Sequence, residues 1–173
     1  ELPFRDFKVR RALSMAINRK EIINTYYGGK AELLGYAIGP IPEFIDMYTP
    51  VDKLPQSSRE LFEYNPDRAK QLLTEAGYPN GFKAEIICVQ GHVDLLSIAK
   101  AYWAKVGIDL SLDVKEAAAF TSMQVGHTYK QAVIHGDMVC TMPYSLFYEH
   151  FRSVYNGGRI NDARINQAYD DMA

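Results

Sequence analysis

Residues 82–114 constrain the fold more than any other part of this chain, because two periodicities alternate within them. Residues 82–89 alternate apolar and other side chains and end in an apolar run, which predicts a strand that becomes buried at its end. Residues 92–106 have helical spacing, and residues 108–114 alternate strictly, which is typical of a strand with one face in water. A strand, a helix and a strand in succession predict a βαβ unit with a right-handed crossover. We therefore predict an α/β fold with a mixed, partly parallel sheet and flanking helices.

Capping signals predict helices on both sides of this unit. Asp6 is placed to cap a first helix, and Asn18 to cap a second. Asn65 and Pro66 start the helix with the clearest signals. Segment 30–63 contains prolines and shows no period, so it predicts a long loop with room for one short helix. The remaining elements expected are helices at 116–125, at 144–154 and from 161, and a third strand at 132–134.

The charge balance and the motifs exclude several classes of function. With 19 basic and 21 acidic side chains and a net charge of -2, the chain lacks the basic face of a nucleic-acid binder and the polybasic stretch that binds anionic membranes. No run approaches the ~20 apolar residues of a membrane helix. The sequence has no nucleophile elbow, phosphate-binding loop, zinc-binding helix motif or paired-cysteine motif. Among the histidines only His135 has a close partner, Asp137, and two residues do not make a metal site, so we expect no catalytic residue, metal or cofactor.

The two cysteines, Cys88 and Cys140, are too few for a disulfide framework. We expect both to be buried free thiols, because free cysteine is among the residue types that are buried most often. A single bridge between them is the alternative if the compartment is oxidising.

The candidate binding residues follow the first and third strands, because ligands of open α/β sheets lie beyond the carboxyl ends of the strands. Gln90 and His92 follow the first strand. The candidates after the third strand are His135, Asp137, Cys140, Tyr144 and Phe147, the last two in an aromatic cluster suited to lining a cleft. The alternative for each residue is an ordinary surface loop. A hydrolase using His135 and Asp137 is disfavoured, because no nucleophile is positioned for them to activate.

Four blocks of the sequence carry a family resemblance. Residues 4–19, FRDFKVRRALSMAINR, resemble the F-x-D-x-x-V-R-x-A-[LI]-x-x-A-[IL]-[DN]-R stretch of the family 5 extracellular solute-binding proteins. The other blocks agree in order and spacing and fall in Gly39–Pro42, Tyr64–Phe82 and Trp103–Ile108. Proteins of this family are the oligopeptide-, dipeptide- and nickel-binding components of bacterial ABC importers.

The resemblance implies one lobe of a two-lobed, type II periplasmic-binding-protein-like fold. Residues 1–173 would form a single domain, most of the second, inserted lobe of a longer chain, in line with a sequence that begins at Glu1 without an initiator Met or a leader. The two lobes of such proteins close over a solute and then dock on ABC permease subunits in the membrane. The resemblance also implies a periplasmic or extracellular protein, secreted or held as a lipoprotein and associated with the membrane through the importer. Neither nucleic acid nor direct membrane insertion is expected for this region.

The solute that the resemblance implies is a peptide, with sugars, opines and metal chelates left open. Peptide binders of the family typically continue the third strand as G-W-x-A-D-Y-x-D-P, whose first Asp can pair with the ligand's α-amine. Here Asp137 stands at the Trp position and Cys140 near that Asp, so an anionic partner for an amine would come from Asp137 or from the other lobe. A ligand sensor, fused to or partnering a signalling protein, is the alternative role for the same fold.

Overall fold

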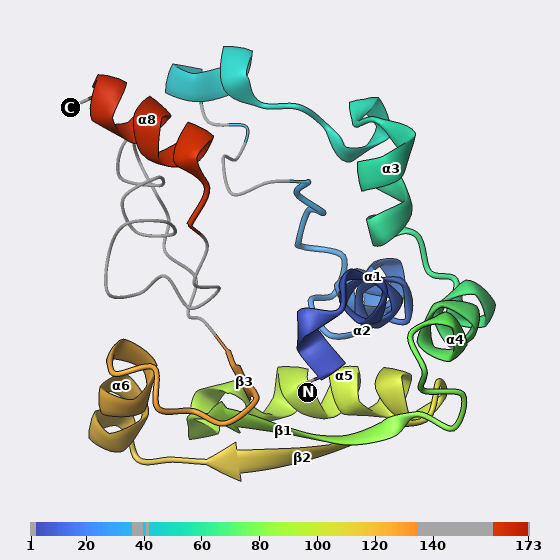
Figure 1. Ribbon diagram of the computed structural model, residues 1–173. Coiled ribbons are helices and arrows are strands. Elements are labelled where there is room, and N and C mark those ends of the chain that lie inside the picture. The colour runs from blue at the N-terminus through green and yellow to red at the C-terminus, as the bar shows by residue number, and fades with distance from the viewer. Residues whose placement is uncertain (1–2, 36–39, 41, 135–160, 173) are drawn as a thin grey trace.

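The computed structural model describes residues 3–35, 40, 42–134 and 161–172. At its centre is a three-stranded sheet in the order β2-β1-β3, in which both strand pairs are parallel. The strands are β1 (Phe82–Cys88), β2 (Ile108–Val114) and β3 (Ala132–Val133). Because β1 is central, Phe82 lies opposite Ile108 on one side and Ile86 opposite Ala132 on the other (Figure 1).

Two helices connect the strands. α5 (Val93–Ala104) joins β1 to β2, and α6 (Ala117–Val125) joins β2 to β3. The first connection is the predicted βαβ unit, with its strands and its helix within two residues of the predicted bounds. The parallel sheet with intervening helices confirms the predicted α/β class.

Three further helices are capped by the predicted side chains. They are α1 (Phe7–Met15), α2 (Arg19–Thr25) and α4 (Pro66–Glu75). The side chains of Asp6, Asn18 and Asn65 each accept a hydrogen bond from a backbone N–H of the first turn, which satisfies a group that the helix itself leaves unpaired. In Figure 1, α1, α2 and α4 lie above the sheet as drawn. The last described helix is α8 (Ala163–Met172).

The segment predicted as a long loop contains more helical turns than the single short helix expected for it. They are α3 (Gln56–Arg59) and the 3-10 turns Pro42–Met47, Val51–Lys53 and Glu60–Phe62. Pro50 and Pro55 stand at the N-caps of two of these turns. Proline lacks the backbone N–H that the interior of a helix needs, but it can stand at the start of a short turn. The segment therefore contains helical turns although its sequence shows no helical period.

The main core lies between the sheet and helices α1, α4 and α5. Alternate residues of the strands face it, and Cys88, Ile108 and Leu110 are each at most 1% exposed. The helices contribute the buried side chains Val9, Ala12, Leu13, Met15, Ala69, Leu72, Leu73 and Leu96. On the other face of β2, Asp109 and Ser111 are exposed, which confirms the predicted wet face. No helix among the described residues is long and apolar enough to cross a membrane.

The prediction of a buried free thiol is confirmed for Cys88. Cys140 and the predicted helix at 144–154 lie outside the described residues.

Candidate functional site

The carboxyl ends of the three parallel strands meet at one edge of the sheet, which we call the strand edge. It is formed by residues 89–92 after β1, Lys115 after β2 and Ile134 after β3. Two backbone hydrogen bonds continue the pairing beyond the strands. The Lys115 N–H donates to the Cys88 carbonyl (2.8 Å) and the Ile134 N–H to the Ile87 carbonyl (3.4 Å). The three segments are thereby held side by side where the strands end.

Gln90 and His92 both lie at the strand edge, on the 3-10 turn that follows β1. Gln90 is exposed and His92 is half-buried. The His92 imidazole packs against the Phe120 ring of α6, with the ring centroids 6.2 Å apart. The Nδ1 atom of His92 is buried and has no hydrogen-bond partner among the described residues. The turn therefore carries an exposed amide and a buried imidazole nitrogen whose hydrogen-bonding capacity is unused within the described part of the chain.

The other predicted binding residues, His135, Asp137, Cys140, Tyr144 and Phe147, lie outside the described residues. In the sequence they follow Ile134, the last described residue at the strand edge. The His135 and Asp137 pair of the disfavoured hydrolase hypothesis falls in the same region.

The structure adds an ion pair to the strand edge that the sequence analysis missed. The Lys115 ammonium lies 2.9 Å from the Asp113 carboxylate, and both side chains are about one-third exposed. Burial, together with the charge of Asp113, raises the pKa of the Cys88 thiol. Lys115 directly follows β2, so applying the strand-end rule to the second strand as well would have found it. No sequence signal marks Phe120 as part of the site, because its contact with His92 depends on where α6 packs.

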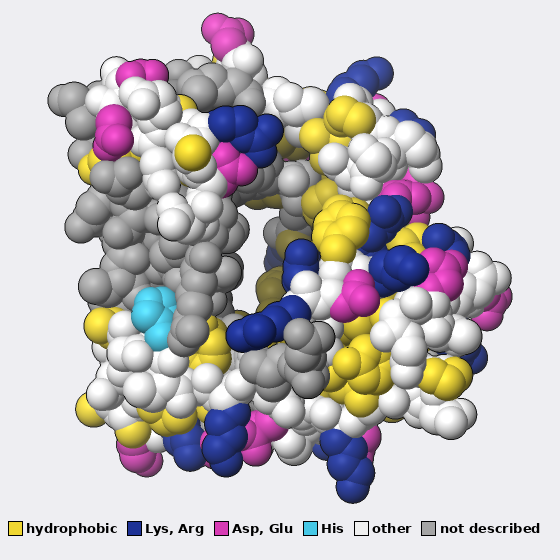
Figure 2. Space-filling view, viewed as in Figure 1, with side chains coloured by type: hydrophobic (Ala, Val, Ile, Leu, Met, Phe, Trp, Pro, Cys, Tyr) yellow, Lys and Arg dark blue, Asp and Glu magenta, His cyan; other side chains and the backbone are white. Residues whose placement is uncertain are grey.

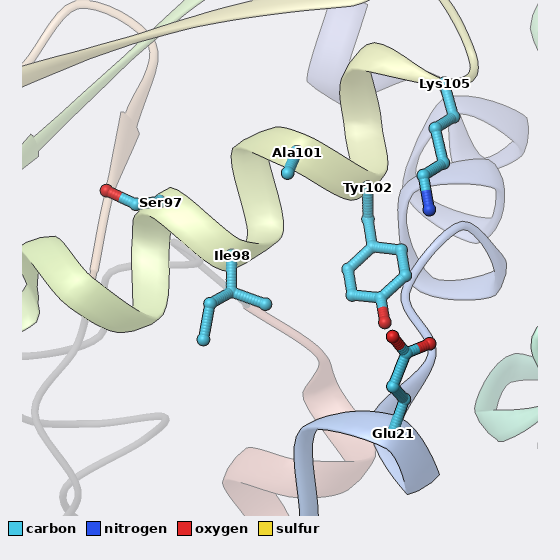
Figure 3. Close-up of a pocket in the computed structure, with 6 residues that line it drawn as sticks. All are labelled: Glu21, Ser97, Ile98, Ala101, Tyr102 and Lys105. Atoms are coloured by element: carbon cyan, nitrogen blue, oxygen red, sulfur yellow. The ribbon is translucent and has the colours of Figure 1, made fainter. Parts of the chain in front are cut away.

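One cavity of about 400 Å³ lies between α2 and α5 (Figure 3). In this view the hydroxyl of Tyr102 points at the carboxylate of Glu21, and Lys105 stands beside the ring. The Lys105 ammonium lies 4.7 Å from the centroid of the Tyr102 ring, a cation–π arrangement. Burial and the hydrogen bond with Glu21 raise the pKa of Tyr102 to about 12. None of the residues lining this cavity belongs to the strand edge.

A second cavity, of about 510 Å³, lies between the start of α2 and residues 51–64, and its walls carry several charged side chains. Figure 2 shows several Lys and Arg side chains among the described residues of the face that is turned to the viewer. Within the described ranges, no group of three or more His, Cys, Asp or Glu side chains could hold a metal ion.

Comparison with known protein families shows which family the chain belongs to. Residues 1–158 match the family described as "Bacterial extracellular solute-binding proteins, family 5 Middle". The chain belongs to this family. The resemblance inferred from the four sequence blocks is thereby confirmed, and the family is one of extracellular binding proteins that serve ABC transporters.

Two named relatives are similar to this family 5 chain in sequence. Heme-binding protein A of Haemophilus influenzae is 35% identical over 114 residues, which cover 61% of this chain and 19% of that protein. Glutathione-binding protein GsiB of Pectobacterium atrosepticum is 33% identical over 118 residues, which cover 66% of this chain and 21% of that protein. The family 5 chain thus spans about a fifth of the length of these relatives.

Solved structures share the fold of the family 5 chain. HbpA2 from Haemophilus parasuis superposes with a TM-score of 0.78 at 26% identity, over 100% of this chain and 34% of that one. An oligopeptide-binding protein from Thermotoga maritima, solved with mannohexaose, gives a TM-score of 0.75 at 24% identity, over 99% of this chain and 36% of that one. These matches confirm a periplasmic-binding-protein-like fold.

Proposed function

We propose that this chain is one lobe of the substrate-binding component of an ABC importer, and that it captures a peptide or a similar small solute against a second lobe. The observation that carries the proposal is the family match over residues 1–158 in a chain whose parallel strands end at a single polar edge. Residues 1–173 would then be a single domain, most of the second lobe. Such a receptor works because its open and closed states have different affinities for the solute, and it does not catalyse a reaction.

The strand edge is the surface of this lobe that we assign to the solute. Gln90 contributes an exposed amide and His92 a buried Nδ1 atom that lacks a partner among the described residues. A solute that forms a hydrogen bond with His92 Nδ1 would remove the free-energy cost of leaving this buried atom unpaired. We propose that His135, Asp137, Cys140, Tyr144 and Phe147 complete the binding surface.

A peptide is favoured as the solute by the names of the relatives. Glutathione, which GsiB is named for binding, is a tripeptide, and a DppA structure with a TM-score of 0.70 at 22% identity was solved with the peptide STSA. Other relatives widen the range, since one is named for binding heme, one structure holds mannohexaose and another, AgaA, holds agropinic acid. The proposed localisation is periplasmic or extracellular, with the membrane reached through the permease subunits of the importer.

Isothermal titration calorimetry on the full-length protein tests the proposal. The panel is glutathione, the tetrapeptide Ser-Thr-Ser-Ala, mannohexaose, agropinic acid and haem. We expect at least one peptide to bind, and much weaker binding to the isolated 173-residue lobe, because half of the contacts are then missing. A folded full-length protein that binds no member of the panel contradicts the proposal.

Substitutions then test the assignment to the strand edge. Gln90→Ala and His92→Ala should each weaken binding of the solute roughly 3- to 10-fold, which is the value of one lost hydrogen bond. Gln71→Ala, an exposed glutamine on α4, is the matched control and should leave the affinity unchanged. Equal affinities for all three variants would remove Gln90 and His92 from the site while leaving the importer role standing.

A further inference from the structure

The cavity of about 510 Å³ at the start of α2 has a cationic wall that the proposed solute site does not use. Arg19, Lys20 and Arg59 line it, together with the carboxylates Asp52 and Glu63. We call it the cationic pocket. Its lining residues come from the N-cap and the first turn of α2 and from residues 33–64, and none of them belongs to the strand edge.

Arg19 is held rigidly in this pocket by neutral groups. Its guanidinium donates hydrogen bonds to the carbonyls of Ser14 (2.8 Å) and Leu61 (3.2 Å) and to the Ser14 hydroxyl (2.9 Å). It also lies 5.5 Å from the centroid of the Phe62 ring. These contacts fix the orientation of the guanidinium, but none of them neutralises its charge.

The charges that line the pocket do not cancel. Arg59 lies 3.7 Å from Glu63. Asp52 lies 3.8 Å from Lys53, which is not one of the lining residues. Among the described residues, neither Arg19 nor Lys20 has a carboxylate within ion-pair distance. Burial lowers the pKa of Arg19, the direction expected for a cation that is withdrawn from water with no anion beside it. Two positive charges are therefore available to a bound anion.

The rest of the wall is apolar. Leu33, Val51 and the Phe62 and Tyr64 rings line the same cavity. Its volume lies in the range of small-molecule sites, which pair apolar walls with a few polar groups that fix orientation. An ion as small as phosphate would leave these walls uncovered, whereas a carboxylate on an apolar body would satisfy both kinds of wall.

From these contacts we infer that the cationic pocket is a second binding site, for a small organic carboxylate with an apolar body. The carboxylate lies between Arg19 and Lys20, and the body covers Leu33, Val51 and Phe62. Arg is suited to this role because its planar fork can donate two parallel hydrogen bonds to one carboxylate. This site is separate from the strand edge, so it stands whether or not the transported solute is a peptide.

The test uses 3-phenylpropionate and its neutral analogue 3-phenylpropionamide, titrated into the full-length protein and followed by methyl NMR. The carboxylate should shift the methyl resonances of Leu33 and Val51. The amide should bind about tenfold more weakly, because it carries no negative charge to pair with the two cations. Raising sodium chloride from ~20 mM to ~500 mM should weaken the carboxylate several-fold through screening. Inorganic phosphate should bind more weakly than 3-phenylpropionate.

Variants separate this pocket from general surface charge. Arg19→Gln with Lys20→Gln removes the two cations assigned to the carboxylate and should weaken 3-phenylpropionate at least about tenfold. Lys70→Gln with Lys100→Gln removes two exposed lysines outside the pocket and should change nothing. If the first variant unfolds, the amide comparison and the salt titration on the unaltered protein still decide. Each of four outcomes would overturn the inference. The first two are that 3-phenylpropionamide or inorganic phosphate binds as tightly as 3-phenylpropionate. The others are that the shifts are confined to the Ile134 methyls, or that both double variants lose the same affinity.

Discussion

The indole Nε1 of Trp103 donates a hydrogen bond to the main-chain carbonyl of Leu13 over 3.0 Å. The bond joins α5 to α1 across 90 positions of sequence. It pairs a carbonyl near the end of α1 that the helix alone would leave without a partner. Trp103 also packs against the main core while staying partly exposed, so it is both a packing residue and a donor.

Trp103→Phe should lower the free energy of unfolding by about 2 kcal/mol, because it leaves the Leu13 carbonyl unpaired and removes part of a packed ring. Urea titration followed by circular dichroism measures the change, since the substitution removes the single tryptophan of the chain. Tyr27→Phe, at a ring that is 43% exposed, is the control and should stay within about 0.5 kcal/mol of the unaltered protein. Equal stability of the two variants would show that the bond between α5 and α1 contributes nothing.

Gly81→Ala should be among the most damaging single substitutions in the chain. Gly81 has φ +72°, and a Cβ placed there would lie 1.8 Å from the carbonyl oxygen of Gly107. Left-handed strain and the backbone clash together should cost about 3 kcal/mol or more of the free energy of unfolding. Thermal or urea unfolding measures the loss.

Two other glycines provide matched controls for that prediction. Gly77 has φ +91° but open space around it, so Gly77→Ala should cost only the strain, about 1–2 kcal/mol. Gly91 has neither a positive φ nor an atom close to where a Cβ would lie, so Gly91→Ala should change stability by less than about 0.5 kcal/mol. A different rank order of the three variants would contradict the close approach of the turn before β1 to the turn before β2.

The pKa of Tyr102 predicts a loss of stability at alkaline pH. Its pKa is raised from 10.0 to about 12 in the folded state, so between these values the folded protein keeps a proton that the unfolded chain releases. Since stability rises with pH only where the unfolded state binds more protons, the free energy of unfolding should fall as the pH rises from 10 to 12. Tyr102→Phe should flatten that slope, whereas Tyr27→Phe should not. Urea titrations at pH 9, 10, 11 and 12, run side by side on the three proteins, provide the comparison; identical slopes would count against a buried phenol beside Glu21.

Cys88 should react slowly with thiol reagents in the folded protein. It is fully buried, and burial with the charge of Asp113 raises the pKa of its thiol, so the reactive thiolate is scarce at pH 8. In a Cys140→Ser background, labelling by a chromogenic disulfide should be at least about a hundredfold slower than in urea, because the thiol must wait for an opening of the structure. Rapid labelling of the folded protein would contradict the burial of the end of β1.

Most of the secondary structure could be predicted from the sequence because its signals are local. Alternation over residues 82–89 and 108–114 and the side chains of Asp6, Asn18 and Asn65 each act within a few positions, and the structure places strands and helix starts there. The segment between residues 42 and 62 contains more short turns than the one short helix predicted, since turns of three to six residues are too short to show a period.

The candidate site was predictable only in outline. A parallel sheet brings the ends of its strands to one edge, so the sequence alone predicts that Gln90 and His92 lie there, and the structure confirms it. The contact of His92 with Phe120 and the pair of Lys115 with Asp113 were not foreseen. The first depends on how α6 packs, whereas the second is formed by residues at the end of β2 that are close in sequence.

The sequence by itself determined the α/β class, the parallel βαβ unit and the family, because periodicity, caps and ordered sequence blocks are properties of the chain. Only the tertiary structure decided which distant groups meet, as in the bond from Trp103 to Leu13 or the Arg19 guanidinium beside the Leu61 carbonyl. Local patterns encode which face of an element is apolar, but the partner of a polar atom on that face is set by how the elements pack. For that reason the cationic pocket, whose charge balance depends on groups more than 40 positions apart, became visible only in three dimensions.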